Sequence, residues 1–279
     1  MHYFLAILLF IFLITTIYFT ISFLFSYKEI YKIKNTIQIQ NTSKIIVSLT
    51  TLPSRINKIY KVIESILNNT IKPDIIYINI PKFSKRENKK YIIPDNIKNI
   101  KNVIINIIDE DYGPITKLYP TLLKENDPES NIICIDDDKE YDKNLIKHLL
   151  LCSQQYNDKC ICITGWNYIN LGFVSIPFIT HLFKNIVNKV DILQCYNGVL
   201  YKRKFFQDDF KYYLNLDKCF TVDDILISKY LKNKNIQILS IPYYYKNNDI
   251  TKGNFTLGNY NLSNNSWIKC INSNIKKDI

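Results

Sequence analysis

Three consecutive aspartates, Asp136, Asp137 and Asp138, are the residues of this sequence that point most directly to chemistry. They follow the apolar run 132–135, which is typical of a buried strand. Adjacent carboxylates repel one another, so a strand end tolerates them where a positive charge compensates. Mg²⁺ or Mn²⁺ binds oxygen ligands and commonly shares its shell with substrate phosphates. The triplet therefore predicts a divalent-metal site, with a solvated acidic turn as the alternative.

A second candidate is the segment 109–117, which reads Asp-Glu-Asp-Tyr-Gly-Pro-Ile-Thr-Lys. Gly113 permits close approach of the backbone to a ligand, and the helix start that we expect after it would attract phosphate. Lys117, on the first turn, can add a positive charge. Asp109 or Asp111 can accept hydrogen bonds from a ribose or a base. The alternative is an ordinary strand–turn–helix connection with a solvated lysine.

A third candidate is the segment 50–55, Thr-Thr-Leu-Pro-Ser-Arg, which follows the first expected strand of the α/β series. In an open α/β sheet this position contacts a nucleotide, and Arg55 can reach its phosphates. A helix start capped by Ser54 would explain the same residues without any function.

The elements that must position these residues alternate between β-branched runs and helical periodicity. We expect strands at residues 45–49, 75–80, 103–108, 132–135 and 160–164, helices over 56–67, from 113 onward and over 142–156, and a loop over 82–102. This alternation predicts an α/β fold with a mainly parallel sheet and helices on both faces. The three candidate segments then fall at the carboxyl ends of strands, where such sheets bind ligands.

The composition excludes some classes of protein. A hydrophobic fraction of 47% argues against wholesale disorder. The net charge of +11 comes mostly from lysines that are spread along the chain, so it does not indicate nucleic-acid binding. The seven cysteines are an odd number without framework spacing, and several lie in apolar runs, which favours buried free thiols and a reducing compartment.

Residues 47–55, 111–118 and 135–138, in this order and spacing, resemble GT-A glycosyltransferases related to the family 2 enzymes of bacteria and large DNA viruses. The similarity covers about residues 44–165 and is weaker to about residue 242. It implies a Rossmann-like GT-A fold and a nucleotide-sugar donor whose diphosphate is held by Mn²⁺ or Mg²⁺. It gives the DxD role of metal ligation to Asp136 and Asp138. Donor contacts are expected from Thr51, Arg55, Asp111, Gly113, Lys117, Asp136 and Asp137.

The resemblance also implies an acidic pair at a later helix start, where one carboxylate deprotonates the acceptor hydroxyl. The matching residues are Asp223 and Asp224, with Asp224 the first choice for the base. A capping box between Thr221 and Asp224 is the structural alternative. Many such enzymes supply a later histidine to the metal. This chain departs from that pattern, because His2, His148 and His181 all precede the acidic pair; we interpret His148 and His181 as structural.

Residues 3–25 carry no charge and are long enough to cross a bilayer as a helix. A signal peptide would need a basic start, a shorter apolar stretch and a small-residue cleavage site. We therefore expect a transmembrane anchor over 1–27, a stalk over 28–43 and a GT-A domain over 44–279, with a nucleotide-sugar half (44–165) and an acceptor half (166–279). Lysines after the span favour a single-pass protein with its catalytic domain on the cytosolic side.

The favoured function is metal-dependent transfer of a sugar from a nucleotide diphosphate to a hydroxyl of a glycan, lipid or protein, with no role for nucleic acid. One alternative is a nucleotidyltransferase, which would normally carry a Gly-rich basic loop after the first strand, whereas residues 50–55 contain no glycine. Others are an inactive transferase and a membrane-tethered basic binding module, which would need its lysines concentrated on one element. Asn197 and Gly198 leave a strand and resemble a stretch that lines the sugar and the acceptor.

Overall fold

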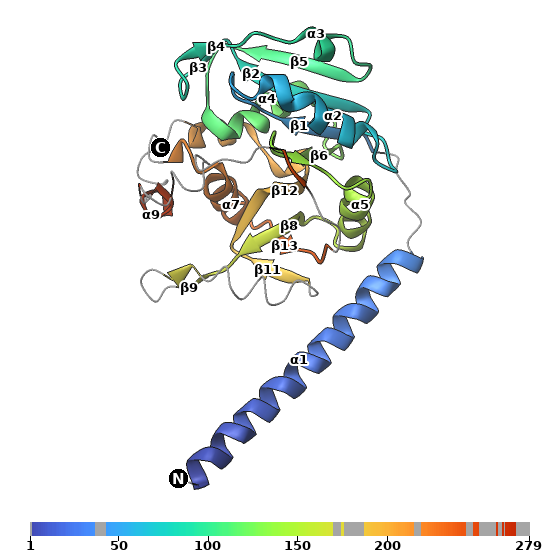
Figure 1. The fold of residues 1–279 in the computed structure, drawn as a ribbon, viewed down its shortest axis with the longest axis vertical. Helices are drawn as coiled ribbons and strands as arrows, with labels where there is room; N and C mark the ends of the chain where they lie inside the picture. The colour runs from blue at the N-terminus through green and yellow to red at the C-terminus, as the bar shows by residue number, and fades with distance from the viewer. Residues whose placement is uncertain are drawn as a thin grey trace.

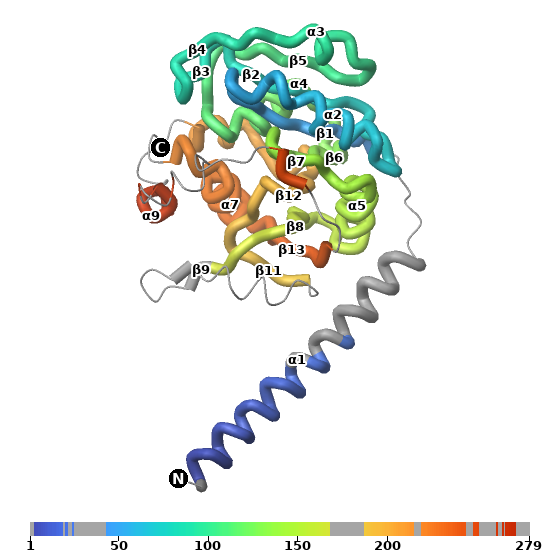
Figure 2. The backbone as a smooth tube through the Cα atoms, viewed as in Figure 1, coloured from blue at the N-terminus to red at the C-terminus, as the bar shows by residue number. Residues whose placement is uncertain are grey.

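The computed structural model describes residues 2–36, 43–169, 174–175, 187–214, 219–243, 248–250, 261, 264 and 266–271. Figure 2 traces the backbone through them. In this part of the chain an eight-stranded sheet runs in the order β11-β13-β8-β12-β6-β1-β2-β5 (Figure 1). Its strands are β1 (Ile45–Leu49), β2 (Ile75–Pro81), β5 (Val103–Ile108), β6 (Asn131–Cys134), β8 (Cys160–Trp166), β11 (Asn188–Val190), β12 (Ile192–Lys202) and β13 (Ile238–Ser240).

The sheet is mixed, with four of its seven strand pairings parallel. β12 is antiparallel to both of its neighbours, β6 and β8, and β11 is antiparallel to β13. In the centre, Val47 of β1 lies between Ile76 of β2 and Ile133 of β6. The predicted α/β class with a large, mostly parallel sheet is therefore confirmed, and the two expected halves of the domain share this one sheet.

Helices cover both faces of the sheet, because successive side chains of a strand point to opposite faces. Ile45, Val47 and Leu49 pack in one core cluster with α2 (Ile59–Leu67) and α5 (Leu145–Gln155). Ile46 belongs to the cluster on the other face, with residues of η2 (Gly113–Lys117), α4 (Tyr119–Lys124) and α7 (Asp223–Asn233). Both clusters consist of buried aliphatic, aromatic and cysteine side chains, which fix the strand ends that form the site.

Shorter elements complete the described chain. The helices among them are η1 (Ile56–Lys58), α3 (Asp95–Lys98), η3 (Arg203–Phe205), η4 (Asp208–Tyr213) and α9 (Ser266–Ile271). Three two-stranded pairs are β3 (Phe83–Ser84) with β4 (Lys89–Lys90), β7 (Lys139–Glu140) with β14 (Asn248–Asp249), and β9 (Tyr168–Ile169) with β10 (Val174–Ser175).

Two expectations about local structure are wrong, and a third is correct in the position of a helix but not in its type. The segment 82–102, expected as a loop, contains the β3–β4 hairpin and α3. The helix expected from Gly113 is a short 3₁₀ helix, followed by α4. Ser54 does not cap a helix, since its backbone N–H and its hydroxyl both donate to Glu87 in the β3–β4 hairpin. This tertiary contact replaces the local cap and holds the hairpin against the end of β1.

The N-terminal segment forms one helix, α1 (His2–Thr36), which continues without a break past residue 27 into the expected stalk (Figure 1). A bilayer span needs about 20 consecutive, predominantly apolar residues. Within the residues that the structure describes, no helix meets both the length and the apolarity required. The prediction that residues 3–25 cross a membrane is therefore not supported.

The cysteines divide into two groups. Cys134, Cys152, Cys160, Cys162 and Cys195 are free and buried, as their apolar surroundings predict. Cys219 and Cys270 instead form a disulfide that closes a loop with a sequence separation of 51 residues. The cysteine spacing did not predict this pair, which joins the segment before α7 to α9.

We predict that Cys270→Ser lowers the free energy of unfolding by about 2–4 kcal/mol, because the crosslink restricts the unfolded chain. Chemical denaturation with and without a reductant measures this difference. The reductant should destabilise the natural chain and leave the variant unchanged. Equal stability of the two chains without reductant would contradict a structural role for the crosslink.

Candidate functional site

A pocket of about 480 Å³ lies over one edge of the sheet. Since β12 is antiparallel to both β6 and β8, the carboxyl ends of β1, β6 and β8 meet at the same edge. Thr51 after β1, the triplet 136–138 after β6 and Trp166 at the end of β8 accordingly all line the pocket. The prediction that the candidate residues of the first half gather at strand ends is confirmed.

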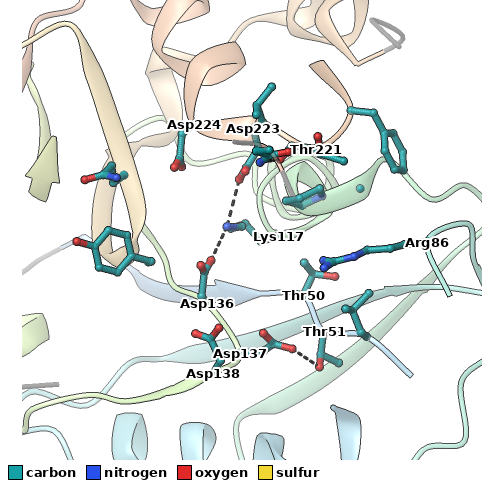
Figure 3. Close-up of a pocket in the computed structure, with 18 of the residues that line it drawn as sticks. Thr50, Thr51, Arg86, Lys117, Asp136, Asp137, Asp138, Thr221, Asp223 and Asp224 are labelled. Atoms are coloured by element: carbon teal, nitrogen blue, oxygen red, sulfur yellow. Dashed lines mark hydrogen bonds and ion pairs between the residues drawn. The ribbon is translucent and has the colours of Figure 1, made fainter. Parts of the chain in front are cut away.

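Asp137 is the structural member of the acidic triplet. It is 6% exposed and accepts a hydrogen bond from the Thr51 hydroxyl at 2.6 Å (Figure 3). It accepts a second hydrogen bond from Arg55 Nη1 at 2.8 Å. Both oxygens of the carboxylate are thereby engaged by the segment after β1. Thr51 and Arg55, predicted to contact a ligand, thus make these direct contacts with Asp137 and also line the pocket.

Asp136 and Asp138 differ from Asp137, since their side chains remain about 30% exposed at the pocket. Asp138 forms a longer ion pair with Arg55, in which Oδ2 lies 3.4 Å from Arg55 Nη1. Burial raises the pKa of Asp138 to about 6, and Asp136 and Asp137 add to the effect. A carboxylate whose charge is disfavoured in this way gains most from a cation. The outer two aspartates therefore have the exposure and charge that suit a hard divalent ion.

Lys117 lies in the interior, with 4% of its surface exposed. Its ammonium is 2.5 Å from Asp136 Oδ1 and 3.1 Å from Asp223 Oδ2, so it bridges two carboxylates from distant parts of the chain (Figure 3). Burial alone would lower the pKa of Lys117, but these carboxylates outweigh it and the pKa lies well above its ordinary value. The lysine expected to meet a phosphate is thus held in an internal ion-pair network.

Asp223 and Asp224 open α7, and the predicted capping box is absent: the N-cap is Val222, without a side-chain cap hydrogen bond. Asp223 is 6% exposed and faces Lys117. Asp224 is more exposed, lines the pocket, and accepts a hydrogen bond from the backbone N–H of Cys195 at 3.0 Å. Burial, and next the charge of Asp223, raise the pKa of Asp224 to about 7. Asp224 is therefore suited to accept a proton near neutral pH.

Gly113 is required by the backbone. Its φ is +71°, and a Cβ there would lie 2.4 Å from the carbonyl oxygen of Phe220, which also lines the pocket. Asp111, expected to meet a ribose or base, accepts hydrogen bonds from the backbone N–H groups of Gly113 and Lys85. These contacts fix the turn after β5 against the β3–β4 hairpin.

Several pocket residues carry no signal in the sequence. Arg86 and Tyr91 lie in or near the β3–β4 hairpin, in the segment that the sequence assigned to a loop. Gln194 and Tyr196 lie on β12, before Gly198, which was expected to approach a ligand. Gly198 instead packs against Leu145 of α5, because its missing Cβ makes room for that side chain. Trp166, Trp267 and Asn261 also line the pocket.

A second group of possible metal ligands lies beside Lys117. Cys195, Asp223 and Asp224 bring one ligand atom each to within 4.8 Å of one another in the part of the chain that is described. The Lys117 ammonium already compensates Asp223, so this group needs a cation less than Asp138 does. His148 packs in α5 with its Nε2 2.6 Å from the Pro242 oxygen, which agrees with a structural role, and His181 lies outside the described residues.

No protein-family model matches the sequence, and no curated protein matches it. Among solved structures, TarS 1–349 of S. aureus is 13% identical, with a TM-score of 0.47 over 73% of this chain and 59% of that one. The structure of the same protein in complex with UDP-GlcNAc is 11% identical, with a TM-score of 0.48 over 83% of this chain and 67% of that one. The 2-C-methyl-D-erythritol 4-phosphate cytidylyltransferase of Francisella tularensis is 12% identical, with a TM-score of 0.43 over 81% of this chain and 100% of that one.

We predict that Lys117→Met costs about 3–5 kcal/mol of unfolding free energy, because it leaves the buried Asp223 carboxylate and the partly exposed Asp136 carboxylate without their cation. Thermal and urea denaturation measure the loss. Lys124→Met is the matched control, since Lys124 is exposed on neighbouring α4 and its replacement should change stability by less than about 0.5 kcal/mol. A variant with full stability and a ten- to a hundredfold weaker nucleotide affinity, a range of about 1.5–3 kcal/mol, would favour a phosphate contact instead.

Proposed function

We propose that this chain is a glycosyltransferase of GT-A type that moves a sugar from a nucleotide diphosphate to an acceptor hydroxyl. The proposal is based mainly on the different surroundings of the three aspartates at residues 136–138. The inner aspartate is saturated by protein contacts, while the outer two keep carboxylates at the pocket. This alternation is what a DxD metal-and-donor site requires, and a merely solvated acidic turn would not bury its central member.

The charges of the pocket support a diphosphate donor. Arg55 and Arg86 line the side near the ends of β1 and the β3–β4 hairpin, beside the triplet. Guanidinium groups bind phosphate oxygens with directed hydrogen bonds. Tyr91, whose hydroxyl donates to the Thr51 carbonyl, adds an aromatic side chain on the same side. We assign the nucleotide to this side of the pocket.

Asp136 and Asp138 fit a hexacoordinate ion that takes one or two protein carboxylates and fills its shell with phosphate oxygens and water. Mn²⁺ or Mg²⁺ there would neutralise the charge that develops on the departing diphosphate. Lys117 holds Asp136 in place from behind, and Arg55 orients Asp138. Residues of this chain thus supply the two ligands and their orientation.

Asp224 is the group that we assign to proton transfer. The acceptor oxygen forms a bond to the anomeric carbon while the bond from that carbon to the diphosphate oxygen breaks, and the electron pair leaves with the diphosphate. The hydroxyl proton passes to Asp224, which the Cys195 N–H orients. Asp223 is less suited to this role because its carboxylate is held in an ion pair with Lys117. One carboxylate acting as base in a single displacement implies inversion of the anomeric centre.

Metal dependence tests the donor site. We expect Asp138→Asn to abolish turnover on a panel of nucleotide sugars and to weaken Mn²⁺ binding in calorimetry, with the fold retained. Asp109→Asn is the matched control, since Asp109 is an exposed acid outside the pocket. Full activity in excess EDTA would contradict the metal site. Release of pyrophosphate in place of a nucleoside diphosphate would assign nucleotidyl transfer.

The pKa of Asp224 gives a separate test. Its charged form is the base, so kcat/KM should fall as the pH drops through about 7 and level off above about pH 8. Asp224→Asn should lose at least about a hundredfold in turnover and keep its melting temperature, because an amide oxygen can still accept from Cys195. Asp223→Asn should instead lower the melting temperature. The reverse pattern would exchange the roles of the two residues.

A further inference from the structure

The side chains that line the pocket differ between its two sides. The side near β1 carries the two arginines and the acidic triplet. The opposite side, here called the tryptophan side, is lined by aromatic and amide side chains: Trp166, Gln194, Phe220, Asn261 and Trp267. Tyr196 also lines the pocket, and the Lys139 ammonium, which pairs with Asp249, lies 5.1 Å from the centroid of its ring. Asp224, the assigned base, lines the same cavity from α7.

Two buried polar atoms on the tryptophan side have no hydrogen-bond partner among the residues that the structure describes. They are Trp166 Nε1 and Asn261 Oδ1, in side chains of residues that are 6% and 4% exposed. The amide nitrogen of Asn261 donates to the Thr221 carbonyl, which leaves the amide oxygen as the free atom. Buried polar groups are almost always paired in native proteins, so an unpaired donor and an unpaired acceptor at a pocket wall call for a ligand.

The wall itself is fixed in place. Trp267, on α9, contacts Trp166 edge to face with ring centroids 4.3 Å apart. α9 is tied to the segment before α7 by the Cys219–Cys270 disulfide, and Lys229 of α7 donates to the carbonyls of Cys270 and Ile271. A ring held in this way loses little conformational freedom when a ligand packs on it.

We propose that the tryptophan side of the pocket is an acceptor subsite for a pyranose, whose ring packs against the tryptophan pair. The proposal rests on the assigned glycosyl transfer and narrows its acceptor from any hydroxyl compound to a sugar. The apolar face of a pyranose suits an aromatic wall. Its hydroxyls both donate and accept, so neighbouring ones can satisfy the indole N–H and the amide oxygen together.

The chain provides its own probe, because Trp166 and Trp267 are its only two tryptophans. We expect intrinsic fluorescence to change saturably on titration with at least one of the methyl pyranosides of glucose, galactose, mannose and N-acetylglucosamine. Sorbitol is the matched control, since it carries hydroxyls like those of glucose without the ring face. An equal response to sorbitol, or no saturable response to any pyranoside, would overturn the proposal.

Variants separate the subsite from the fold. Trp267→Ala and Asn261→Ala should each raise the Kd of the responding pyranoside at least about tenfold in saturation-transfer NMR, as expected for loss of a stacking or hydrogen-bonding partner, and Trp267→Phe should recover part of it. Tyr212→Ala is the control, because Tyr212 is an exposed aromatic outside the pocket. If Trp267→Ala does not fold, Asn261→Ala decides. Unchanged Kd in both binding-site variants contradicts the assignment.

Nucleotide binding to the natural chain distinguishes the two proposals. Calorimetric titration with UDP, GDP, ADP and CDP in the presence of Mn²⁺ tests the donor side alone. Nucleotide binding without a pyranoside response leaves glycosyl transfer standing and removes the sugar acceptor. A pyranoside response without any nucleotide binding supports the subsite as a carbohydrate-binding site and removes the proposed transfer.

Discussion

A lysine ammonium shielded from water, between carboxylates from two distant segments, is the interaction on which the site depends. A buried charge is tolerated only when it is paired. Lys117 therefore requires Asp136 after β6 and Asp223 at the start of α7 to meet around it. This requirement fixes the separation between the acidic triplet and the later acidic pair. It also distinguishes the two members of that pair. Asp223 is held in an ion pair with Lys117, whereas Asp224 remains available for proton transfer.

The same logic organises the donor side. Asp137 is almost fully buried, and Thr51 and Arg55 satisfy it. Asp136 and Asp138, on either side of it in the turn after β6, keep carboxylates that are about 30% exposed at the pocket. The segment after β1 thus acts twice: it supplies residues to the pocket wall, and it satisfies Asp137. Because protein contacts satisfy Asp137, Asp136 and Asp138 are the members of the triplet that can bind a cation.

Backbone constraints hold the opposite wall. Phe220 approaches Gly113 so closely that only a residue without a Cβ fits, and the positive φ of Gly113 imposes the same choice. A disulfide begins one residue before Phe220, at Cys219, and reaches α9 with Trp267. The turn after β5, the start of α7 and α9 therefore form a continuous wall from the ion-pair network to the tryptophan pair.

The sequence by itself determined the elements with strong periodicity. β1, β2, β5, β6 and β8 lie close to their predicted positions, because continuous β-branched runs between turns have few other stable arrangements. It also located the acidic triplet, Arg55 and Gly113 at the pocket, since parallel strands bring their carboxyl ends to one edge. The acidic pair at the start of α7, which also lines the pocket, was indicated by the family resemblance.

Only the tertiary structure decided what each of these residues touches. The partner of Lys117 lies in a segment more than a hundred residues later, so local spacing could suggest a phosphate contact but could not reveal Asp223. Ser54 and Thr221 match capping patterns, yet Ser54 binds Glu87 and the Thr221 carbonyl binds Asn261. The Cys219–Cys270 pair and the two tryptophans likewise meet through chain folding. Contacts between distant segments depend on how helices pack on the sheet, and no short-range pattern encodes that packing.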